Sequence, residues 1–121
     1  MTLPSDPQKF AQTWIDDWNR HNIQAILSHY ADPIEFCSPF IVKLVGDSRG
    51  VIHGKKALEN YFLQGLKAYP DLHFEWIETL VGVNSLVLYY RSVNGLLSAE
   101  WMRFNHEGLV EKVVAHYQDR A

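Results

Sequence analysis

The sequence has almost no cysteine and no long apolar run, and both absences narrow the classes of protein it can belong to. Cys37 is the only cysteine among 121 residues, which excludes an internal disulfide and a cysteine-rich metal site. Such cysteine usage is typical of a reducing compartment, and we expect the cytoplasm. No run approaches the roughly 18 apolar residues of a membrane span. Met1–Phe10 has no apolar core of a secretory signal, so we expect no membrane association.

An excess of positive charge is missing as well. The net charge is −3, and no basic stripe is present, so we expect no nucleic-acid partner. Repeats and low-complexity segments are absent, and the length favours one domain over residues 1–121. His73 and Glu75 share a strand face but have no third ligand at a suitable spacing. We therefore expect no metal and no cofactor.

Aromatic residues, in contrast, are plentiful. The sequence contains four Trp, six Tyr and six Phe, and 47% of its residues are hydrophobic. This supply suits a packed core, and it also suits the walls of an apolar cavity that binds a small molecule.

Helix signals dominate the first half. Asp6-Pro7 resembles a helix start, and Phe10, Trp14 and Trp18 recur with helical spacing, which predicts a helix over about 6–20. A short second helix follows His21-Asn22 and ends at Pro33. A third helix begins at Gly54 and stops at Tyr69-Pro70-Asp71.

Strand signals dominate the second half. Alternating or apolar segments predict strands over 34–38, 72–80, 85–93, 96–104 and 109–117. Helices followed by antiparallel strands indicate the α+β class, with three helices packed on the sheet.

Two segments leave alternatives open. The apolar run that begins at Phe40 and the turn residues up to Gly54 form either a flexible loop over a pocket mouth, or an extra short strand or a subunit contact. A three-residue loop in Asn105–Gly108 would place His116 on the same sheet face as Glu100. A two- or four-residue loop would place Tyr117 there instead.

The Asn94-Gly95 pair is a strong signal for a two-residue hairpin turn. This turn pairs Tyr89 with Glu100, and it places Arg91 diagonally beside Glu100 on the same face. Glu100 is then either the carboxylate of a structural ion pair with Arg91 or the working group of a pocket. A guanidinium neighbour would lower the pKa of Glu100, whereas a proton donor needs a raised pKa.

The order of several local motifs resembles one family. The motifs are Tyr30-Ala31-Asp32 after the first two helices, Gly54-Lys55-Lys56-Ala57-Leu58, Tyr69-Pro70-Asp71-Leu72, and Met102-Arg103-Phe104-Asn105 with Gly108. Together they resemble the SnoaL-like proteins of the nuclear transport factor 2 superfamily, which includes ketosteroid isomerase. The resemblance implies an NTF2-like, or cystatin-like, cone of curved antiparallel sheet on three helices. It also implies an apolar pocket inside the cone and a homodimer formed through the outer sheet face.

Only one of three functional positions of ketosteroid isomerase keeps its chemical group in this sequence. The oxyanion-hole acid of ketosteroid isomerase falls on Glu100, its tyrosine falls on Trp14 and its base falls on Ser38. Steroid isomerisation of that type is therefore not expected. By the same resemblance, Val113, Ala115 and Tyr117 point inward, against the three-residue-loop register. The resemblance to epoxide hydrolases is confined to the fold, because Glu111 is the only second acid on the last strand.

Two hypotheses of function follow. The first is an enzyme of the isomerase, cyclase or hydrolase type that acts on a small hydrophobic or partly polar molecule, with Glu100, Arg91 and His116 as its polar groups. The second is a non-catalytic ligand-binding or dimeric adaptor domain. We expect the pocket to be lined by Trp14, Trp18, Tyr30, Ser38, Phe40, Tyr61, Phe62, Tyr89, Met102 and Tyr117.

Overall fold

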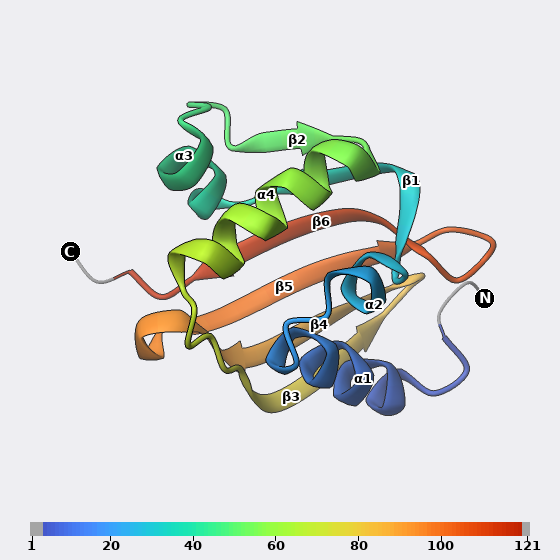
Figure 1. Ribbon diagram of the computed structural model, residues 1–121. Coiled ribbons are helices and arrows are strands. Elements are labelled where there is room, and N and C mark those ends of the chain that lie inside the picture. Colours follow the sequence, from blue (N-terminus) through green and yellow to red (C-terminus); the bar gives the residue numbers. More distant parts are fainter. Residues whose placement is uncertain (1–3, 120–121) are drawn as a thin grey trace.

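A computed structural model describes residues 4–119 of the chain (Figure 1). The ends of the predicted domain, residues 1–3 and 120–121, lie outside the described residues. The elements in order are α1 (Pro7–Asn19), α2 (Ile23–Leu27), β1 (Tyr30–Cys37), α3 (Pro39–Val45), β2 (Val51–His53), α4 (Lys55–Ala68), β3 (Glu75–Gly82), β4 (Ser85–Arg91), the short 3₁₀ turn η1 (Val93–Gly95), β5 (Leu97–Phe104) and β6 (Val110–Tyr117). No helix in this part of the chain is both long and apolar enough to cross a membrane.

The first helix begins where the sequence predicts. The side chain of Asp6 caps α1 by accepting a hydrogen bond of 3.0 Å from the backbone N–H of Lys9, and Pro7 occupies the first turn. Both residues satisfy the needs of a helix start, because the first N–H groups have no partner inside the helix. The apolar face of α1 turns Trp14 and Trp18 into the core.

The segment after β1 forms a helix that the sequence pattern did not predict. Ser38 caps α3 through a 3.2 Å bond from the backbone N–H of Phe40, and Pro39 stands in the first turn. Gly46 ends the helix in the left-handed region, at φ 79°, where glycine meets no steric penalty. The extra short strand that we considered for this segment is present as β2.

The sheet has the strand order β2-β1-β6-β5-β4-β3. Its neighbours are antiparallel except for β1 and β6, which run parallel, with Phe36 paired to Val113. The expectation of a wholly antiparallel sheet is therefore wrong at this pair. Pro33 lies inside β1 rather than ending the second helix. It is tolerated because the ladder to β6 is irregular between Tyr30 and Glu35.

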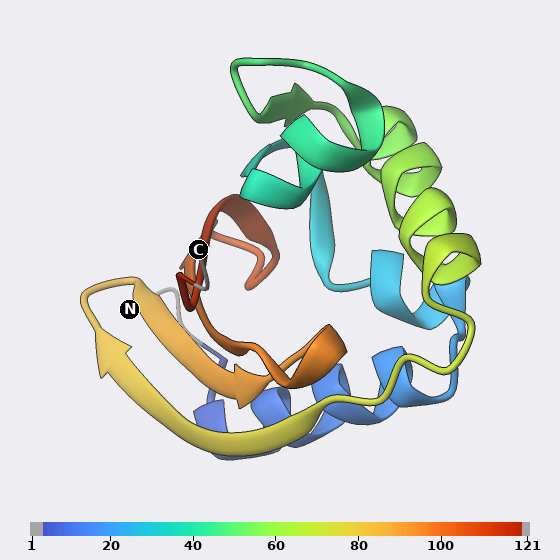
Figure 2. The ribbon, with the colours of Figure 1, turned by 90° about the vertical axis from the view of Figure 1, so that its left-hand side faces the viewer.

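The sheet curls without closing, and the helices cover its concave side (Figures 1 and 2). The helix α4 crosses over β1, while α1 lies against β3. The fold class is thus α+β, as predicted, with four α-helices among residues 4–119 where three were expected. The concave side of the sheet carries the core and, at its open end, the candidate site.

The turn between β4 and β5 corrects a predicted register. Ser92 and Leu96 close a three-residue loop, so Glu100 pairs with Leu88 and not with Tyr89. A shift of one residue moves every side chain of a strand to the other face relative to its partner. Glu100 therefore shares the concave face with Tyr90, and Arg91 points to the opposite face.

The turn between β5 and β6 resolves the two conflicting expectations for the last strand. The loop does contain three residues, closed by the pairing of Asn105 with Leu109, and Gly108 adopts φ 77°. A bulge then leaves Glu111 unpaired between the ladder positions Val110 and Lys112. The bulge shifts the rest of β6 by one residue, so that Glu100 pairs with Ala115. Because of this bulge, Tyr117 faces the concave side and His116 faces outward.

Candidate functional site

The candidate site is a cavity at the open end of the curled sheet. Its lining includes residues of α3, the end of α4, η1 and the end of β6, and these elements lie toward the viewer in Figure 2. The described residues that line it are Trp14, Trp18, Phe36, Phe40, Leu44, Tyr61, Phe62, Gly65, Tyr69, Leu72, Phe74, Tyr90, Ser92, Val93, Glu100 and Tyr117. The walls are therefore mainly aromatic and aliphatic.

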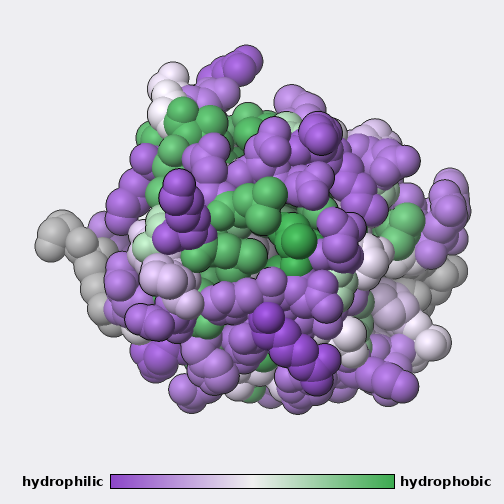
Figure 3. Space-filling view, in the orientation of Figure 1, coloured by the Kyte–Doolittle hydropathy of each residue, from purple (hydrophilic) through white to green (hydrophobic). Residues whose placement is uncertain are grey.

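The free space inside is limited. About 60 Å³ is open to the centres of water molecules, whereas one buried water needs roughly 10–15 Å³ in that measure. The cavity thus has room for several waters or for a small ring. On the face drawn in Figure 3, apolar side chains reach the surface over α3 and along α4, within a mostly polar surround.

Phe40 of α3 stands at the mouth between two tyrosines. Its ring meets that of Tyr117 edge to face, with centroids 4.6 Å apart, and it meets that of Tyr69 in the same way at 6.0 Å. Lys43 lies 5.6 Å from the centre of the Phe40 ring and donates a 3.3 Å hydrogen bond to the Tyr69 hydroxyl. This rim brings together three elements that are distant in the sequence.

Glu100 is the only carboxylate among the described residues that line the cavity. Its side chain is buried on β5, and the hydroxyl of Tyr90 on β4 donates a hydrogen bond to Oε2. Burial raises the pKa of Glu100 from its ordinary value of 4.5 to about 7, although the hydrogen bond from Tyr90 acts in the opposite direction. Glu100 is therefore much easier to protonate near neutral pH than an exposed glutamate.

The phenol groups around Glu100 remain protonated at neutral pH. Burial, together with the nearby charge of Glu100, raises the pKa of Tyr30, Tyr90 and Tyr117 well above the ordinary value. Burial also raises the pKa of Tyr61. These hydroxyls are hydrogen-bond donors at neutral pH, and two of them are already engaged, since Tyr90 donates to Glu100 and Tyr61 donates to Ser38.

The predicted site residues fall into three groups. Glu100 and six predicted wall residues line the cavity, namely Trp14, Trp18, Phe40, Tyr61, Phe62 and Tyr117. Three others are buried outside the lining. Tyr30 accepts a 3.0 Å bond from Trp14 Nε1, Ser38 accepts a 3.4 Å bond from the Tyr61 hydroxyl, and Met102 packs in the core.

The third group lies outside the cavity, and these predictions are wrong in position. Tyr89, Arg91 and His116 point to the outer face of the sheet, because the β4–β5 loop is one residue longer than expected and the bulge in β6 turns His116 outward. Arg91 is exposed and donates a 2.9 Å bond to the carbonyl of Gly95. The predicted pair of Arg91 with Glu100 does not form, and the pKa of Glu100 moves in the direction opposite to that which the pair would cause.

Tyr90, the partner of Glu100, was not among the site residues predicted from the sequence. A signal for it existed, because Leu86, Leu88 and Tyr90 alternate along one strand face and are all buried. The two-residue turn predicted between β4 and β5 placed this face on the side of the sheet opposite to Glu100, because the actual loop has one residue more. No group of three His, Cys, Asp or Glu side chains lies close enough to hold a metal ion within residues 4–119.

Comparison with known proteins gives one family and a broad set of similar folds. The model of the SnoaL-like domain family matches residues 11–118, while no curated protein matches. A SnoaL-like protein of unknown function from Burkholderia thailandensis E264 is 45% identical, with a TM-score of 0.90 over 93% of this chain and 94% of that one.

Two further solved structures resemble the fold alone. A candidate ketosteroid isomerase from Kribbella flavida DSM 17836 is 15% identical, with a TM-score of 0.73 over 95% of this chain and 79% of that one. The epoxide hydrolase/cyclase-like enzyme SalBIII, which takes part in pyran ring formation in the polyether salinomycin, is 13% identical, with a TM-score of 0.76 over 98% and 95% of the two chains.

Proposed function

The chain belongs to the SnoaL-like domain family, and from this premise we propose that it binds a small, mainly apolar molecule in its cavity and transfers a proton on that molecule through Glu100. The observation that carries the proposal is the position of Glu100. It is a lone buried carboxyl in an aromatic cavity, hydrogen-bonded by Tyr90. Carboxyl groups in apolar sites are a common solution for acid–base chemistry near neutral pH.

The chemistry of the walls supports a substrate of this kind. Apolar and aromatic side chains dominate the lining, so they favour a hydrophobic ring or chain. Glu100, with a pKa of about 7, exchanges a proton readily at neutral pH. The Tyr90 hydroxyl supports the ionised form of Glu100 through its hydrogen bond. Isomerisation, cyclisation and hydrolysis of a small molecule all use such a proton transfer.

A non-catalytic binding role is the second candidate, and one observation favours it. Ser38, to which the family resemblance assigns the position of the base in ketosteroid isomerase, caps α3 and accepts a hydrogen bond from Tyr61. Its hydroxyl oxygen is therefore already engaged in hydrogen bonds within the protein. A protein that binds without catalysis would still use the cavity, but it would not depend on the titration of Glu100.

We also propose a homodimer formed through the outer face of the sheet. Half-buried Val87, Tyr89, Trp101 and Val114 lie on this face of β4, β5 and β6, and a second copy would cover them. For the compartment we propose the cytoplasm, because Cys37 is free.

Exchange of α-protons of small cyclic ketones in D₂O, followed by NMR, tests the enzymatic proposal. Glu100→Gln keeps the size of the side chain but cannot accept the proton, so exchange should fall by about 10²–10⁴-fold. Glu107→Gln, a change of the same kind in the exposed β5–β6 turn, is the matched control and should leave exchange unchanged. Exchange that survives in Glu100→Gln contradicts the catalytic role of Glu100 and leaves the binding role.

A further inference from the structure

Three side chains stand in one row across the concave face of the sheet, next to Glu100. Tyr90 of β4 pairs with Ser98 of β5, and Ser98 pairs with Tyr117 of β6. Glu100 occupies the next concave position of β5 after Ser98, so it lies diagonally beside both tyrosines. The small serine between them leaves room for both rings. The strand register thus places two phenol groups around one carboxyl group.

The hydroxyl of Tyr117 lies among the polar atoms of the cavity. Burial raises the pKa of Tyr117 most, and the charge of Glu100 raises it further. The nearby hydroxyls of Tyr90 and Ser38 act on this pKa in the opposite direction. Phe40 holds the Tyr117 ring from the side of the mouth, edge to face, with centroids 4.6 Å apart. The ring is therefore fixed at the mouth while its hydroxyl stands close to Glu100.

The protein uses some of the hydroxyl protons in this cluster, but not that of Tyr117. Tyr61 donates to Ser38 at 3.4 Å, and Tyr90 donates to Oε2 of Glu100. Ser38 Oγ also accepts a bond from a backbone N–H, so both acceptor positions of this hydroxyl oxygen are filled. Within residues 4–119, no acceptor stands at hydrogen-bonding geometry to the Tyr117 hydroxyl.

This hydroxyl is also accessible from the cavity. Within the described part of the chain, the buried polar side-chain atoms that lack a partner and are closed off from solvent are Trp18 Nε1 and Ser98 Oγ. Tyr117 Oη and Glu100 Oε1 have no partner at hydrogen-bonding geometry among the same residues, but they do not belong to this closed set. Both side chains line the cavity. A ligand atom can therefore reach a free donor and a free carboxyl oxygen together.

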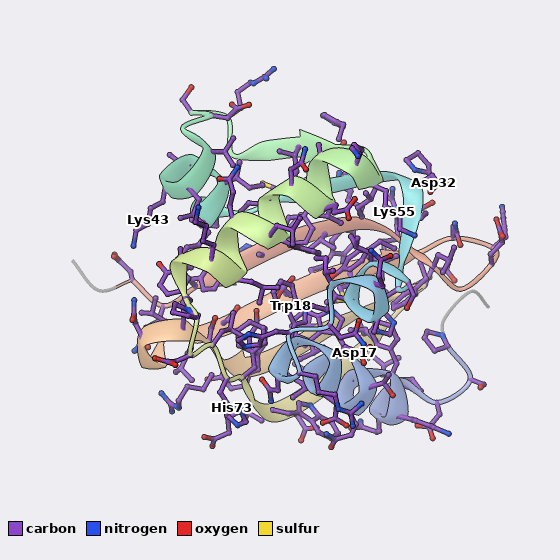
Figure 4. All side chains as sticks on the ribbon, in the orientation of Figure 1. Asp17, Trp18, Asp32, Lys43, Lys55 and His73 are labelled. Atoms are coloured by element: carbon purple, nitrogen blue, oxygen red, sulfur yellow. The ribbon has the colours of Figure 1, made fainter. Side chains whose placement is uncertain are left out.

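The charges around the cavity favour an uncharged ligand group at this point. No lysine and no arginine is found among the described residues that line it. Lys43 extends outward from α3 at the rim (Figure 4), where it donates to the Tyr69 hydroxyl. An anionic group beside Glu100 would have no counter-charge in an apolar site, which is costly. A neutral oxygen that accepts a hydrogen bond avoids this penalty and matches the Tyr117 donor.

We propose that the Tyr117 hydroxyl donates a hydrogen bond to an uncharged acceptor oxygen of the ligand and holds the adjoining atoms next to Oε1 of Glu100 for proton transfer. This inference rests on the proposed function, because it names the group that orients the ligand for Glu100. It makes Tyr117 a second catalytic residue, on the strand next to that of Glu100.

Cyclohexanone labelled with ¹³C at the carbonyl carbon tests the hydrogen bond directly, because such a bond moves this resonance downfield. Bound to the wild-type protein, the probe should resonate downfield of its position in cyclohexane. Tyr117→Phe should lose most of this shift and bind the probe about 2–12-fold more weakly, as expected for one net hydrogen bond. Tyr89→Phe removes a hydroxyl from the outer face of the sheet and should change neither quantity.

Exchange of the α-protons of the same probe in D₂O tests the catalytic part. When an α C–H bond breaks, its proton passes to Glu100 and its electron pair moves onto the carbonyl oxygen, where Tyr117 stabilises the charge. Return of a deuteron from Glu100 to the carbon completes the exchange. Loss of one such donor typically costs about 10²–10³-fold in rate. Exchange at saturating probe should therefore slow by this factor in Tyr117→Phe, well beyond the loss of affinity.

The outcomes separate this inference from the function on which it rests. If the probe bound to the wild type resonates where it does in cyclohexane, the role of Tyr117 is overturned, and this measurement does not depend on the folding of a variant. An unchanged shift or an unchanged exchange rate in Tyr117→Phe also overturns it, while the proposed function stands. If the wild-type protein neither binds the probe nor exchanges its protons, the proposed function fails, and the role of Tyr117 fails with it.

Discussion

The Tyr90 hydroxyl donates a hydrogen bond to Oε2 of Glu100 across two neighbouring strands, and both side chains are buried on the concave face of the sheet. The bond joins the one carboxylate of the described cavity lining to a phenol whose own pKa is raised, first by burial and then by the charge of Glu100. The protonation of Glu100 therefore depends on Tyr90 and on the exclusion of water. Both dependences can be measured.

Replacing Tyr90 by Phe should raise the pKa of Glu100 further. The lost hydrogen bond stabilises the carboxylate form, while the burial that disfavours the charge remains. A ¹³C NMR titration of the Glu100 carboxyl in Tyr90→Phe should give a midpoint above the wild-type value. Tyr89→Phe, in the next position but on the outer face, is the control and should leave the midpoint in place. A lower midpoint in Tyr90→Phe would show that the bond does not favour the ionised form.

The raised pKa of Glu100 predicts a specific dependence of stability on pH. A group whose pKa is higher in the folded than in the unfolded state adds stability below the unfolded value, and this contribution is lost as the pH rises through the folded value. For Glu100 the contribution is complete below about 4.5, and it declines until the pH exceeds about 7. The shift corresponds to about 3 kcal/mol at roughly 1.4 kcal/mol per pKa unit.

Urea unfolding of the wild type and of Glu100→Gln at several pH values tests this. The difference in the free energy of unfolding, wild type minus variant, should fall by about 3 kcal/mol between pH 4 and pH 8. The other titrating groups are common to both proteins and cancel in the difference. A difference that rises with pH would mean that Glu100 is held in its ionised form.

The proposed dimer predicts that a charge on the outer face separates the subunits. Trp101→Glu places a carboxylate among the half-buried side chains of this face, where pairing with a second copy would bury it without a partner. Sedimentation should show a wild-type dimer and a monomeric variant. Leu63→Glu, which adds the same charge on an exposed position of α4, should remain dimeric. A monomeric wild type at micromolar concentration would contradict the proposal.

Much of the fold could be predicted from the sequence, because several elements carry strong local signals such as helical spacing of apolar residues and a capping side chain. The spacing of Trp14 and Trp18 and the capping residue Asp6 fixed the first helix closely. The helix α3 was missed because its apolar run has no clear periodicity, although Ser38-Pro39 before it and Gly46 after it are good boundary signals.

The candidate site was harder to predict, because it depends on register. The loop before β5 has one residue more than predicted. As a result, Tyr90 lies on the same sheet face as Glu100, and Arg91 lies on the opposite face. Because of the bulge at Glu111, the side chain of Tyr117 faces inward and that of His116 faces outward. Neither a loop length nor a bulge can be derived from alternating hydrophobicity when both faces of a sheet are largely covered.

The titration of the Glu100 carboxyl in the wild-type protein tests the central claim most directly. Selective ¹³C labelling of glutamate and comparison with Glu100→Gln identify its resonance. We expect a midpoint at about pH 7, because the side chain is buried in an apolar cavity. A midpoint at or below about 4.5 would contradict the proton-transfer role of Glu100, since Glu100 would then be an ionised structural carboxylate throughout the physiological range.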